Sequence, residues 1–586
     1  MVIIADHWSD IDASIEIFTL PGRQSPWKGV KEAYIAPQDT SSQTSLAWTK
    51  NWLQNCLEYH NCCNIPKTFE SSPKRLIDVL DSRMNGSVQL IETFGRDRQY
   101  LSLSHCWGDP SLHPLSLKTT KDNLCRHLEG IPWKDLSKTF QDAINFVRCL
   151  GEKYIWIDSL CIMQDSAEDW TEESGKMAGI YQNSIMTIAA TKSDNGSGGC
   201  FSTPNDEYKA YPFAVRYCDE SSYLMYCRKS QAHWSHGEYY NEAVEAPLLE
   251  RAWVYQERQL SPRTLHFGNQ ELVWECREEL ACECGLWNTL PQDSLKFQRS
   301  FWPSFNDPSN FKDLQKSSIS RIAGFTGEPD IVHIWHNAVM GYCGLGLTRA
   351  SDRLPAIAGI AKLLQKFRRN DEYLAGLWKD SLFEDLLWQV CSNSDTQKRN
   401  TTLAPSWSWA CVGGMIVQIY DIGEVYHRMA SLVNAQVLPE GPDVYLRVPS
   451  GSLTIEGYLF SAQPKASLLS KNRSIDTSDF KLELCSSDCG LSSSNFTQKE
   501  CTLSQNHGLR GKFHSTQHRR YRAAPRSRYE RLTGLGTVDC YLILRLKDGQ
   551  STYERVGLLR TCSRSSKMRL LSDQTLEGSK QTIVLE

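Results

Sequence analysis

Three short blocks of the sequence carry the side chains that could do chemistry: Tyr100–Gly108, Tyr154–Asp165 and Glu250–Arg258. In the first two blocks, polar residues directly follow apolar runs that are typical of β-strands. Ligands of an open α/β sheet bind beyond the carboxyl ends of its strands, so these positions favour a ligand site. The candidate ligand-binding residues there are Ser104, Trp107 and Gly108 after the first run and Asp158, Gln164 and Asp165 after the second.

Asp158 is the first catalytic candidate. An ionised carboxylate that follows three apolar strand residues is costly to bury unless a cation or several donors meet it. One interpretation is contact with a ligand or a transition state. The other is a helix cap or a salt bridge to Arg251, and the sequence leaves both open.

The third block supplies the remaining ligand-binding candidates, Arg251, Trp253, Gln256 and Glu257. A guanidinium group can hold a carboxylate through two hydrogen bonds, so we expect Arg251 to pair with Asp158 or Asp165. Such a pair would also explain the block as a structural closure of the fold without catalysis.

His105 and Cys161 together suggest a thiol nucleophile with its base. A nucleophilic cysteine needs an adjacent base and an electropositive setting, and the sequence shows neither. Cys161 lies between Leu160 and Ile162, which favours a buried, inert thiol. His105 remains a catalytic candidate because its predicted turn exposes it.

The elements around these residues alternate between strand and helix. Strands are expected at 100–104, 154–157 and 185–190, and helices at 135–150 and 171–181, where apolar residues recur every three or four positions. This order predicts an α/β fold with a doubly wound, mostly parallel sheet, in which the first two strands are adjacent and parallel.

A helix near the N-terminus brings thiols together. Cys56, His60 and Cys63 fall on one face of the helical pattern around Trp52. A structural zinc site needs four ligands, and only Cys62, the neighbour of Cys63, is close in sequence. We therefore expect these thiols to pack under the helix, and no metal or cofactor is predicted.

Length and composition restrict the class of protein. The chain has 586 residues, too many for one core, with a net charge of -4, 40% hydrophobic and 23% charged residues. This charge gives no general attraction to nucleic acid or membranes. No apolar run reaches the roughly 18 residues of a membrane span, and Met1–Asp10 lacks a basic leader. A cytoplasmic protein whose 21 cysteines are mostly free thiols is expected.

Four regions are predicted along the chain: a lead segment at 1–95, an α/β domain at 96–265, a mainly helical region at 266–425 and a β-rich region at 426–586. Residues 508–531 are strongly basic with interleaved tyrosines. Nucleic-acid binding, a solvated insertion and an artefact of gene prediction would each explain this stretch. We favour the insertion, because no nucleic-acid-binding fold accompanies it, and nucleic acid is not an expected partner.

The three blocks (YLSLSHCWG, YIWIDSLCIMQD and ERAWVYQER) resemble those of the fungal heterokaryon incompatibility (HET) domain. The resemblance continues between the blocks, where Asp169, Trp170, Glu173, Met177, Ile180 and Tyr181 match the family's DW..E...M..IY helix. It extends to WLQNCLEYHNCC and RLIDV before the blocks and to LTRASDRLPAIAGIA, YLAGLW and APSWSWA after them. The similar region therefore ends at about residue 460.

The resemblance implies a role in fungal non-self recognition and programmed cell death, and a fold related to Toll/interleukin-1 receptor (TIR) domains. TIR enzymes that cleave NAD+ use a helix-borne glutamate, which makes Glu173 a further catalytic candidate. No TIR catalytic motif, dinucleotide fingerprint or P-loop is present. Two hypotheses follow: an NAD+ hydrolase, or a non-enzymatic scaffold that signals by self-association or through protein partners.

Overall fold

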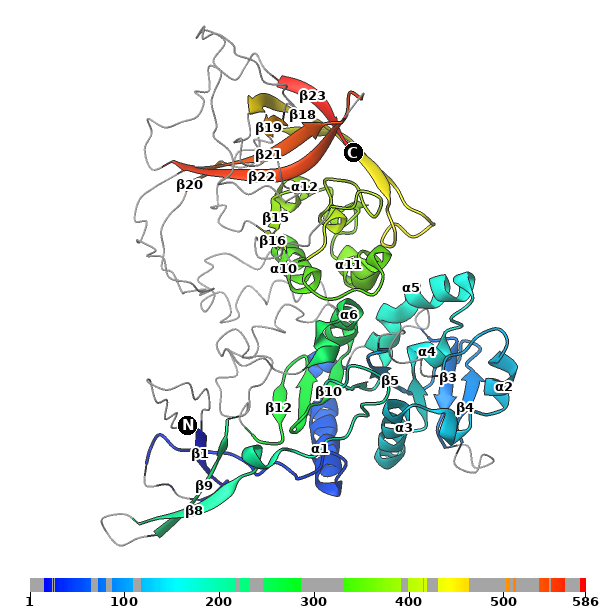
Figure 1. Cartoon of the computed structure of the whole chain (residues 1–586), viewed down its shortest axis with the longest axis vertical. Helices are drawn as coiled ribbons and strands as arrows, with labels where there is room; N and C mark the ends of the chain where they lie inside the picture. The colour runs from blue at the N-terminus through cyan, green and yellow to red at the C-terminus, as the bar shows by residue number, and fades with distance from the viewer. Residues whose placement is uncertain are drawn as a thin grey trace. The chain divides into compact units, whose positions relative to one another are not determined.

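The computed structural model contains two compact units, which fall within residues 1–319 and 320–586 (Figure 1). The structure describes residues 15–64 without 24 and 26, 72–80, 87–108, 117–216, 222–230, 246–285, 331–390, 399–418 without 415, 430–462, 501–505, 510–512, 537–547, 550–563 and 580–586. The predicted basic insertion at 508–531 lies outside the described residues except for 510–512. None of the helices described is long and apolar enough to cross a membrane.

An eight-stranded sheet forms the centre of the first unit, in the order β12-β11-β10-β7-β5-β6-β3-β4. Its strands are β3 (Arg75–Asp78), β4 (Gln89–Glu92), β5 (Leu101–Ser104), β6 (Tyr154–Trp156), β7 (Thr187–Ala189), β10 (Arg263–Phe267), β11 (Leu272–Cys276) and β12 (Leu280–Cys282). The central strands β10, β7, β5 and β6 pair in parallel, whereas both edges pair antiparallel. The sheet is therefore mixed, because short connections such as β10 to β11 form hairpins.

The predicted adjacency of the first two strands is confirmed. β5 and β6 pair in parallel, with Leu101 opposite Ile155. Between them lie α2 (Leu124–Glu129) and α3 (Lys138–Leu150). Helix α3 begins where the Ser137 hydroxyl accepts a hydrogen bond from the Phe140 amide, and it ends at Gly151, whose φ is 88°. The carboxyl ends of β5, β6 and β7 consequently lie at one edge of the sheet.

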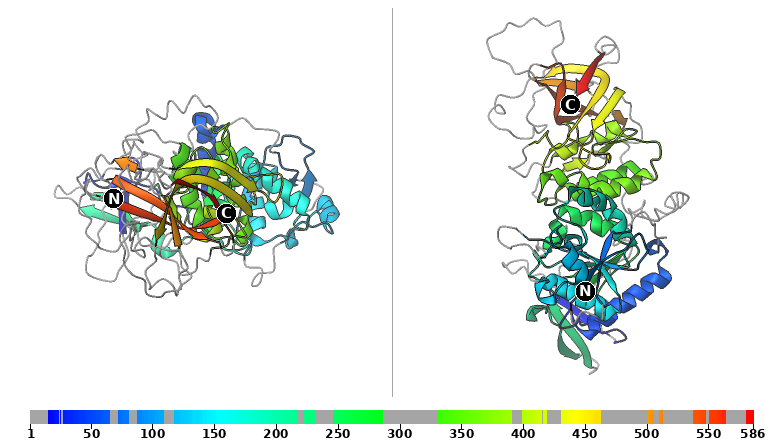
Figure 2. Two further views of the ribbon diagram at one scale, coloured as in Figure 1. Left: turned by 90° about the horizontal axis from the view of Figure 1, so that it is seen from above. Right: turned by 90° about the vertical axis from the view of Figure 1, so that its right-hand side faces the viewer.

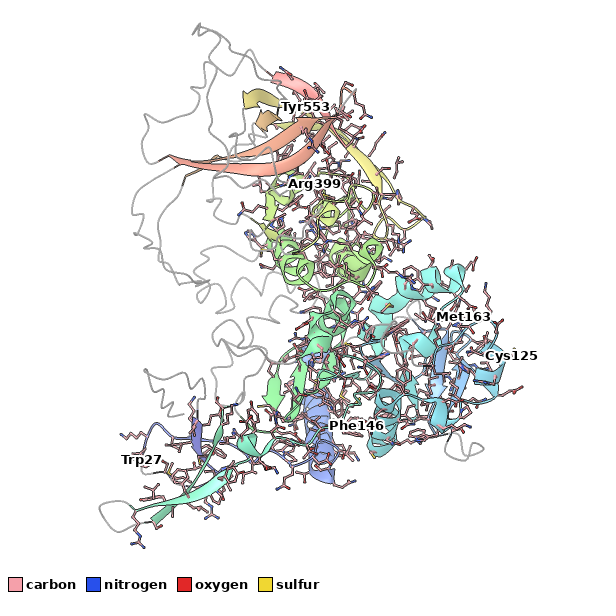
Figure 3. The ribbon with its side chains drawn as sticks, in the orientation of Figure 1. Trp27, Cys125, Phe146, Met163, Arg399 and Tyr553 are labelled. Carbon is pink, nitrogen blue, oxygen red and sulfur yellow. The ribbon has the colours of Figure 1, made fainter. Side chains whose placement is uncertain are left out.

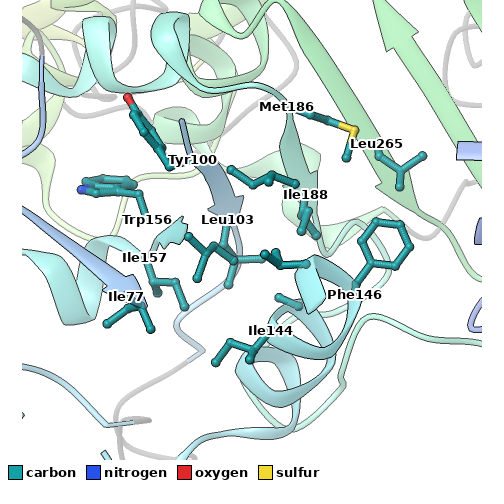
Figure 4. Close-up of a cluster of buried hydrophobic side chains, with 14 of the residues drawn as sticks. Ile77, Tyr100, Leu103, Ile144, Phe146, Trp156, Ile157, Met186, Ile188 and Leu265 are labelled. Atoms are coloured by element: carbon teal, nitrogen blue, oxygen red, sulfur yellow. The ribbon is translucent and has the colours of Figure 1, made fainter. Parts of the chain in front are cut away.

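Helices cover both faces of this sheet: α3 packs on one face and α5 (Ala167–Asn183) on the other (Figures 1 and 4). On the α5 face, the rings of Trp156 and Tyr181 meet edge to face with centroids 5.5 Å apart. On the α3 face, Phe146 meets Phe267 in the same way at 5.1 Å. Burial of each such side chain contributes roughly 1.5–3 kcal/mol, so this core fixes the strand ends.

The lead segment is part of the same core. Helix α1 (Gln43–Tyr59) packs against β11, where Trp52 stacks on Trp274 with centroids 6.4 Å apart. Strands β3 and β4 of the lead segment complete one edge of the sheet, and β11 and β12 complete the other. The sheet thus extends beyond the predicted domain limits of 96 and 265 on both sides.

A smaller four-stranded sheet in the first unit has the order β2-β1-β9-β8. Its strands are β1 (Ile15–Thr19), β2 (Lys31–Glu32), β8 (Tyr211–Arg216) and β9 (Ser222–Lys229). A buried ion pair crosses it, in which Arg228 Nε lies 2.9 Å from Glu16 Oε2. Trp27 lies exposed beside this sheet, and Cys125 is an exposed thiol on α2 (Figure 3).

The second unit combines helices with a larger sheet (Figures 1 and 2). Its smaller elements are α10 (Ile331–Cys343), α11 (Ala358–Gln365), α12 (Leu382–Asp385), β13 (Tyr373–Leu374), β14 (Leu377–Trp378), β15 (Trp388–Val390) and β16 (Ile416–Gln418). The larger sheet comprises β17 (Ser431–Leu438), β18 (Ser450–Ala462), β19 (Cys501–Gln505), β20 (Arg510–Lys512), β21 (Thr537–Leu546), β22 (Tyr553–Ser563) and β23 (Lys580–Leu585). Strand β23 pairs with both β22 and β18, which closes a ring of pairings.

Tryptophans dominate the core of the second unit. The indole nitrogens of Trp335 and Trp409 both donate to the Gly376 carbonyl, at 3.0 and 2.8 Å. Gly376 has a φ of 97°, and a Cβ there would lie 2.7 Å from the Trp409 indole nitrogen. Glycine is therefore required in YLAGLW for conformation and for space.

Candidate functional site

The polar residues predicted to meet at the strand ends do so around Asp158. Asp158 is the first residue of the short helix α4 (Asp158–Cys161), which directly follows β6. Trp107, three residues beyond β5, donates a hydrogen bond of 2.9 Å from its indole nitrogen to Asp158 Oδ2. The Ser159 amide donates to Asp158 Oδ1 at 2.6 Å. Two donors thus stabilise the carboxylate, whereas the predicted helix cap is not formed: Ile157 is the N-cap residue of α4, and no side chain caps this helix.

His105 completes the contacts of this carboxylate. Its Nδ1 lies 3.8 Å from Asp158 Oδ1, and its ring packs edge to face on Phe140. Burial lowers the pKa of His105, and Asp158 opposes this shift. The imidazole is therefore neutral near pH 7. Within the part of the chain that the structure describes, its Nε2 and the Ser159 hydroxyl are buried without a hydrogen-bond partner.

Arg251 does not make the predicted ion pair. Within the described residues it pairs with neither Asp158 nor Asp165, and its Nη1 donates instead to the His105 carbonyl at 3.2 Å. The reason is that other donors satisfy both carboxylates: Asp165 accepts two hydrogen bonds from the Lys121 amide. Arg251 precedes helix α6 (Ala252–Leu260) and joins the third block to the first through the backbone.

Glu257 on α6 is the most perturbed carboxylate of the site. It is buried, and Ser104 Oγ donates to its Oε2 at 2.5 Å. Burial raises the pKa of Glu257 to about 7; the charge of Asp158 acts in the same direction, and hydrogen bonds from Ser104 and Tyr181 oppose it. The three blocks therefore form one strand-end cluster, which consists of Ser104, His105, Trp107, Asp158, Arg251 and Glu257.

The other predicted site residues have structural contacts. Gln164 Nε2 donates to the carbonyls of Asp158 and Ile162, at 3.2 and 3.0 Å. Gly108 has a φ of 82°, which explains glycine after Trp107. Gln256 is buried, and Trp253 is half-buried against the core.

Glu173 and Cys161 do not share the contacts of the strand-end cluster. Glu173 is fully buried; it accepts from the Lys74 amide at 3.1 Å and from Lys176 Nζ at 3.0 Å. These bonds account for the carboxylate on α5 without a ligand. Burial raises the pKa of the Cys161 thiol to about 12, which agrees with an inert thiol.

Sequence reasoning missed an ion pair that supports the second block. Arg75 on β3 holds Asp169 of α5 through two bonds, Nη1–Oδ2 of 3.0 Å and Nη2–Oδ1 of 2.6 Å. It also donates to the Cys161 carbonyl at 2.7 Å, which fixes the end of α4. The sequence does contain a signal for this pair: Arg75 stands at the start of the apolar run RLIDV, and a guanidinium buried there needs an acceptor.

A second group of chemically competent side chains lies where α1 meets β11. The Cys56, His60 and Cys63 side chains converge with Cys276, and one ligand atom from each lies within 4.8 Å of all the others. Sequence reasoning lacked a fourth ligand because Cys276 is far from the others along the chain. A smaller set, Glu271, Cys282 and Cys284, offers only three such atoms.

Comparison with known proteins addresses the region that contains the three blocks. Residues 100–257 match a family model described as heterokaryon incompatibility protein (HET). Neither the curated proteins nor the solved structures contain a match to the chain. The matched range begins one residue before β5 and ends at Glu257, so it includes every residue of the strand-end cluster. The chain therefore carries a heterokaryon incompatibility (HET) domain at residues 100–257.

Proposed function

We propose that this protein acts in the cytoplasm in fungal non-self recognition, and that its HET domain triggers growth arrest or cell death. The match of residues 100–257 supports the first part of this proposal. The trigger would be a protein partner or a second copy of the chain, which a domain embedded in a longer protein is suited to sense.

The strand-end cluster is the proposed effector site, and it binds a nucleotide such as NAD+. The partly exposed side chain of Asp158 is the observation that supports this proposal. Its side chain is 22% exposed, whereas that of His105 is 1% exposed and Glu173 is fully buried. Asp158 is therefore the catalytic candidate that can touch a ligand, and the Trp107 indole beside it can stack on a base.

The chemistry proposed for this site resembles that of TIR enzymes. Cleavage of the bond between ribose and nicotinamide leaves positive charge on the ribosyl group, which an ionised carboxylate stabilises. Asp158 would supply that charge, while Trp107 and Ser159 keep it oriented. Glu257 would act as a positioning residue through Ser104, since it is too deeply buried to reach a ligand. A TIR-like fold of the HET domain would agree with the parallel centre of the sheet.

The test is overexpression in a fungal host together with NAD+ turnover by the purified full chain. Asp158→Asn and Trp107→Ala should abolish toxicity and nicotinamide release while folded protein is still produced. Asp206→Asn is the matched control, because Asp206 is a strongly exposed aspartate in an ion pair with Lys209 and lies outside the strand-end cluster. Toxicity that persists in both soluble variants would contradict the proposed site.

A non-enzymatic, self-associating scaffold is the second candidate function. The contacts of Arg251, Asp165 and Glu173 favour it, because each satisfies a structural group of the fold itself. This hypothesis predicts toxicity without nicotinamide release and a molar mass that rises with concentration in light scattering. A monomeric protein that releases nicotinamide would exclude it.

A further inference from the structure

The ends of helix α1 and strand β11 bring four side chains that can bind a metal close together. Cys56 and His60 lie one helical turn apart at the end of α1, so they share a face. The chain then turns into the short 3-10 helix η1 (Asn61–Cys63), which returns Cys63 to the same place. Cys276, the last residue of β11, approaches from the sheet that α1 covers.

The distances match a tetrahedral site. One ligand atom from each of the four residues lies within 4.8 Å of all the others, and Cys276 Sγ is 3.3 Å from His60 Nδ1. With zinc–sulfur bonds of about 2.3 Å, tetrahedral sulfur ligands stand about 3.8 Å apart. The three thiols are buried, and four protein ligands complete a tetrahedral set, as in structural rather than catalytic zinc sites.

The groups around the four side chains also fit a metal centre. His60 Nε2 faces Glu279 Oε2 at 3.9 Å, so a carboxylate stands behind the ring while Nδ1 points inward. The Glu279 amide donates to Cys276 Sγ at 3.2 Å. Outer contacts of this kind orient ligands and stabilise thiolate sulfur.

Arg263 places a buried positive charge next to the Cys56 thiol. Its side chain on β10 is buried, and its Nε donates to Cys56 Sγ at 3.1 Å. Its other described acceptors are neutral: the carbonyls of Ile185 and Cys63 and the side-chain oxygen of Asn64. A buried guanidinium without an anion is strongly unfavourable, so the sulfur should carry negative charge.

We propose that Cys56, His60, Cys63 and Cys276 bind a structural Zn²⁺ ion. All three cysteines would bind the ion as thiolates, and three thiolates with one neutral imidazole would give the site a net charge of -1, which Arg263 balances. Cys₃His is an established ligand set for structural zinc, and thiolate ligands disfavour magnesium and calcium. The ion would join α1 to β11, two segments that lie on either side of residues 100–257.

Metal content of the full-length protein tests the proposal. Protein produced in zinc-supplemented medium should contain about one zinc ion per chain, as a single four-ligand site requires. Cys276→Ser and His60→Phe should lose the zinc, whereas His60→Cys should retain it as a Cys₄ site. Cys200→Ser is the matched control, because Cys200 is an equally buried thiol of the same unit, near the Thr139 carbonyl.

If the variants are insoluble, the wild-type protein alone can test whether the site binds a metal. Replacement of the metal by Co²⁺ should give the intense visible absorption of a tetrahedral thiolate site. Wild-type protein without zinc that also fails to bind Co²⁺ would overturn the proposal. So would zinc retained by a soluble Cys276→Ser variant, or a disulfide among Cys56, Cys63 and Cys276 found in unreduced protein.

Discussion

Ser104 and Glu257 are 153 residues apart in the chain and share a buried hydrogen bond of 2.5 Å. This bond joins the end of β5 to α6, and therefore the first block to the third. The Glu257 pKa is raised to about 7 mainly by burial, so near neutral pH the carboxyl group holds its proton about half of the time. The contact between the two blocks should consequently depend on pH.

Glu257→Gln should remove this dependence. The folded protein holds the Glu257 proton more tightly than the unfolded chain, so Glu257 lowers stability progressively as the pH rises from about 4.5 to about 7. The full effect is at most about 3 kcal/mol, and it should be absent from the variant. Relative to wild type, Glu257→Gln should therefore gain thermal stability between pH 5 and pH 8. A stability difference between variant and wild type that stays constant from pH 5 to pH 8 would contradict the shift.

Trp107 and Asp158 should be energetically coupled. Trp107→Phe removes the indole donor, and Asp158→Asn weakens the acceptor of the 2.9 Å hydrogen bond. Because Asp158 is partly exposed, we expect a coupling of only about 1 kcal/mol in a double-mutant cycle of unfolding free energies. Strict additivity of the two single changes would show that the bond contributes nothing to stability.

Substitution by alanine should lower stability at one glycine and raise it at another. Gly151 ends α3 with a φ of 88°, a conformation that disfavours a Cβ, so Gly151→Ala should destabilise the protein by about 1 kcal/mol. Gly175 lies inside α5 with open space around a Cβ, so Gly175→Ala should stabilise it by up to about 1 kcal/mol. Chemical denaturation of both variants measures the difference, and the same sign for both would refute the conformational argument.

Among the ion pairs near the second block, breaking the Arg75–Asp169 pair should lower the free energy of unfolding most. Both side chains are 4% exposed, and Arg75→Met leaves the buried Asp169 carboxylate with Lys74, 3.3 Å away, as its cationic partner, so the loss should be about 3 kcal/mol. Lys209→Met breaks an exposed pair with Asp206 and should leave the free energy of unfolding almost unchanged, because solvent screens the pair. Equal losses in urea unfolding would mean that burial does not set the strength of these pairs.

The sequence predicted the features that depend on neighbouring residues. Residues 138–150 form a helix that Gly151 ends, and residues 101–104 and 154–156 form adjacent parallel strands, because periodicity and a short crossover decide both. Asp158, Trp107 and His105 meet for the same reason, since parallel neighbours share an edge.

Contacts that join distant segments could not be predicted in this way. Asp158 finds its donors in Trp107 and the Ser159 amide, so the plausible partner Arg251 is not needed. Cys276 meets Cys56 only because α1 packs on β11. No spacing rule links residues from a helix and a strand that lie so far apart in the chain.

The strands outside residues 100–257 determine how the domain can be excised or transplanted. A fragment cut at these limits would lack β3 and β10, which pair with β6 and β7, so both sides of its parallel centre would expose unpaired backbone. Such edges recruit other chains and promote aggregation. A transferable fragment should therefore start before α1 and end after β12, and toxicity assays with shorter pieces would report on misfolded protein.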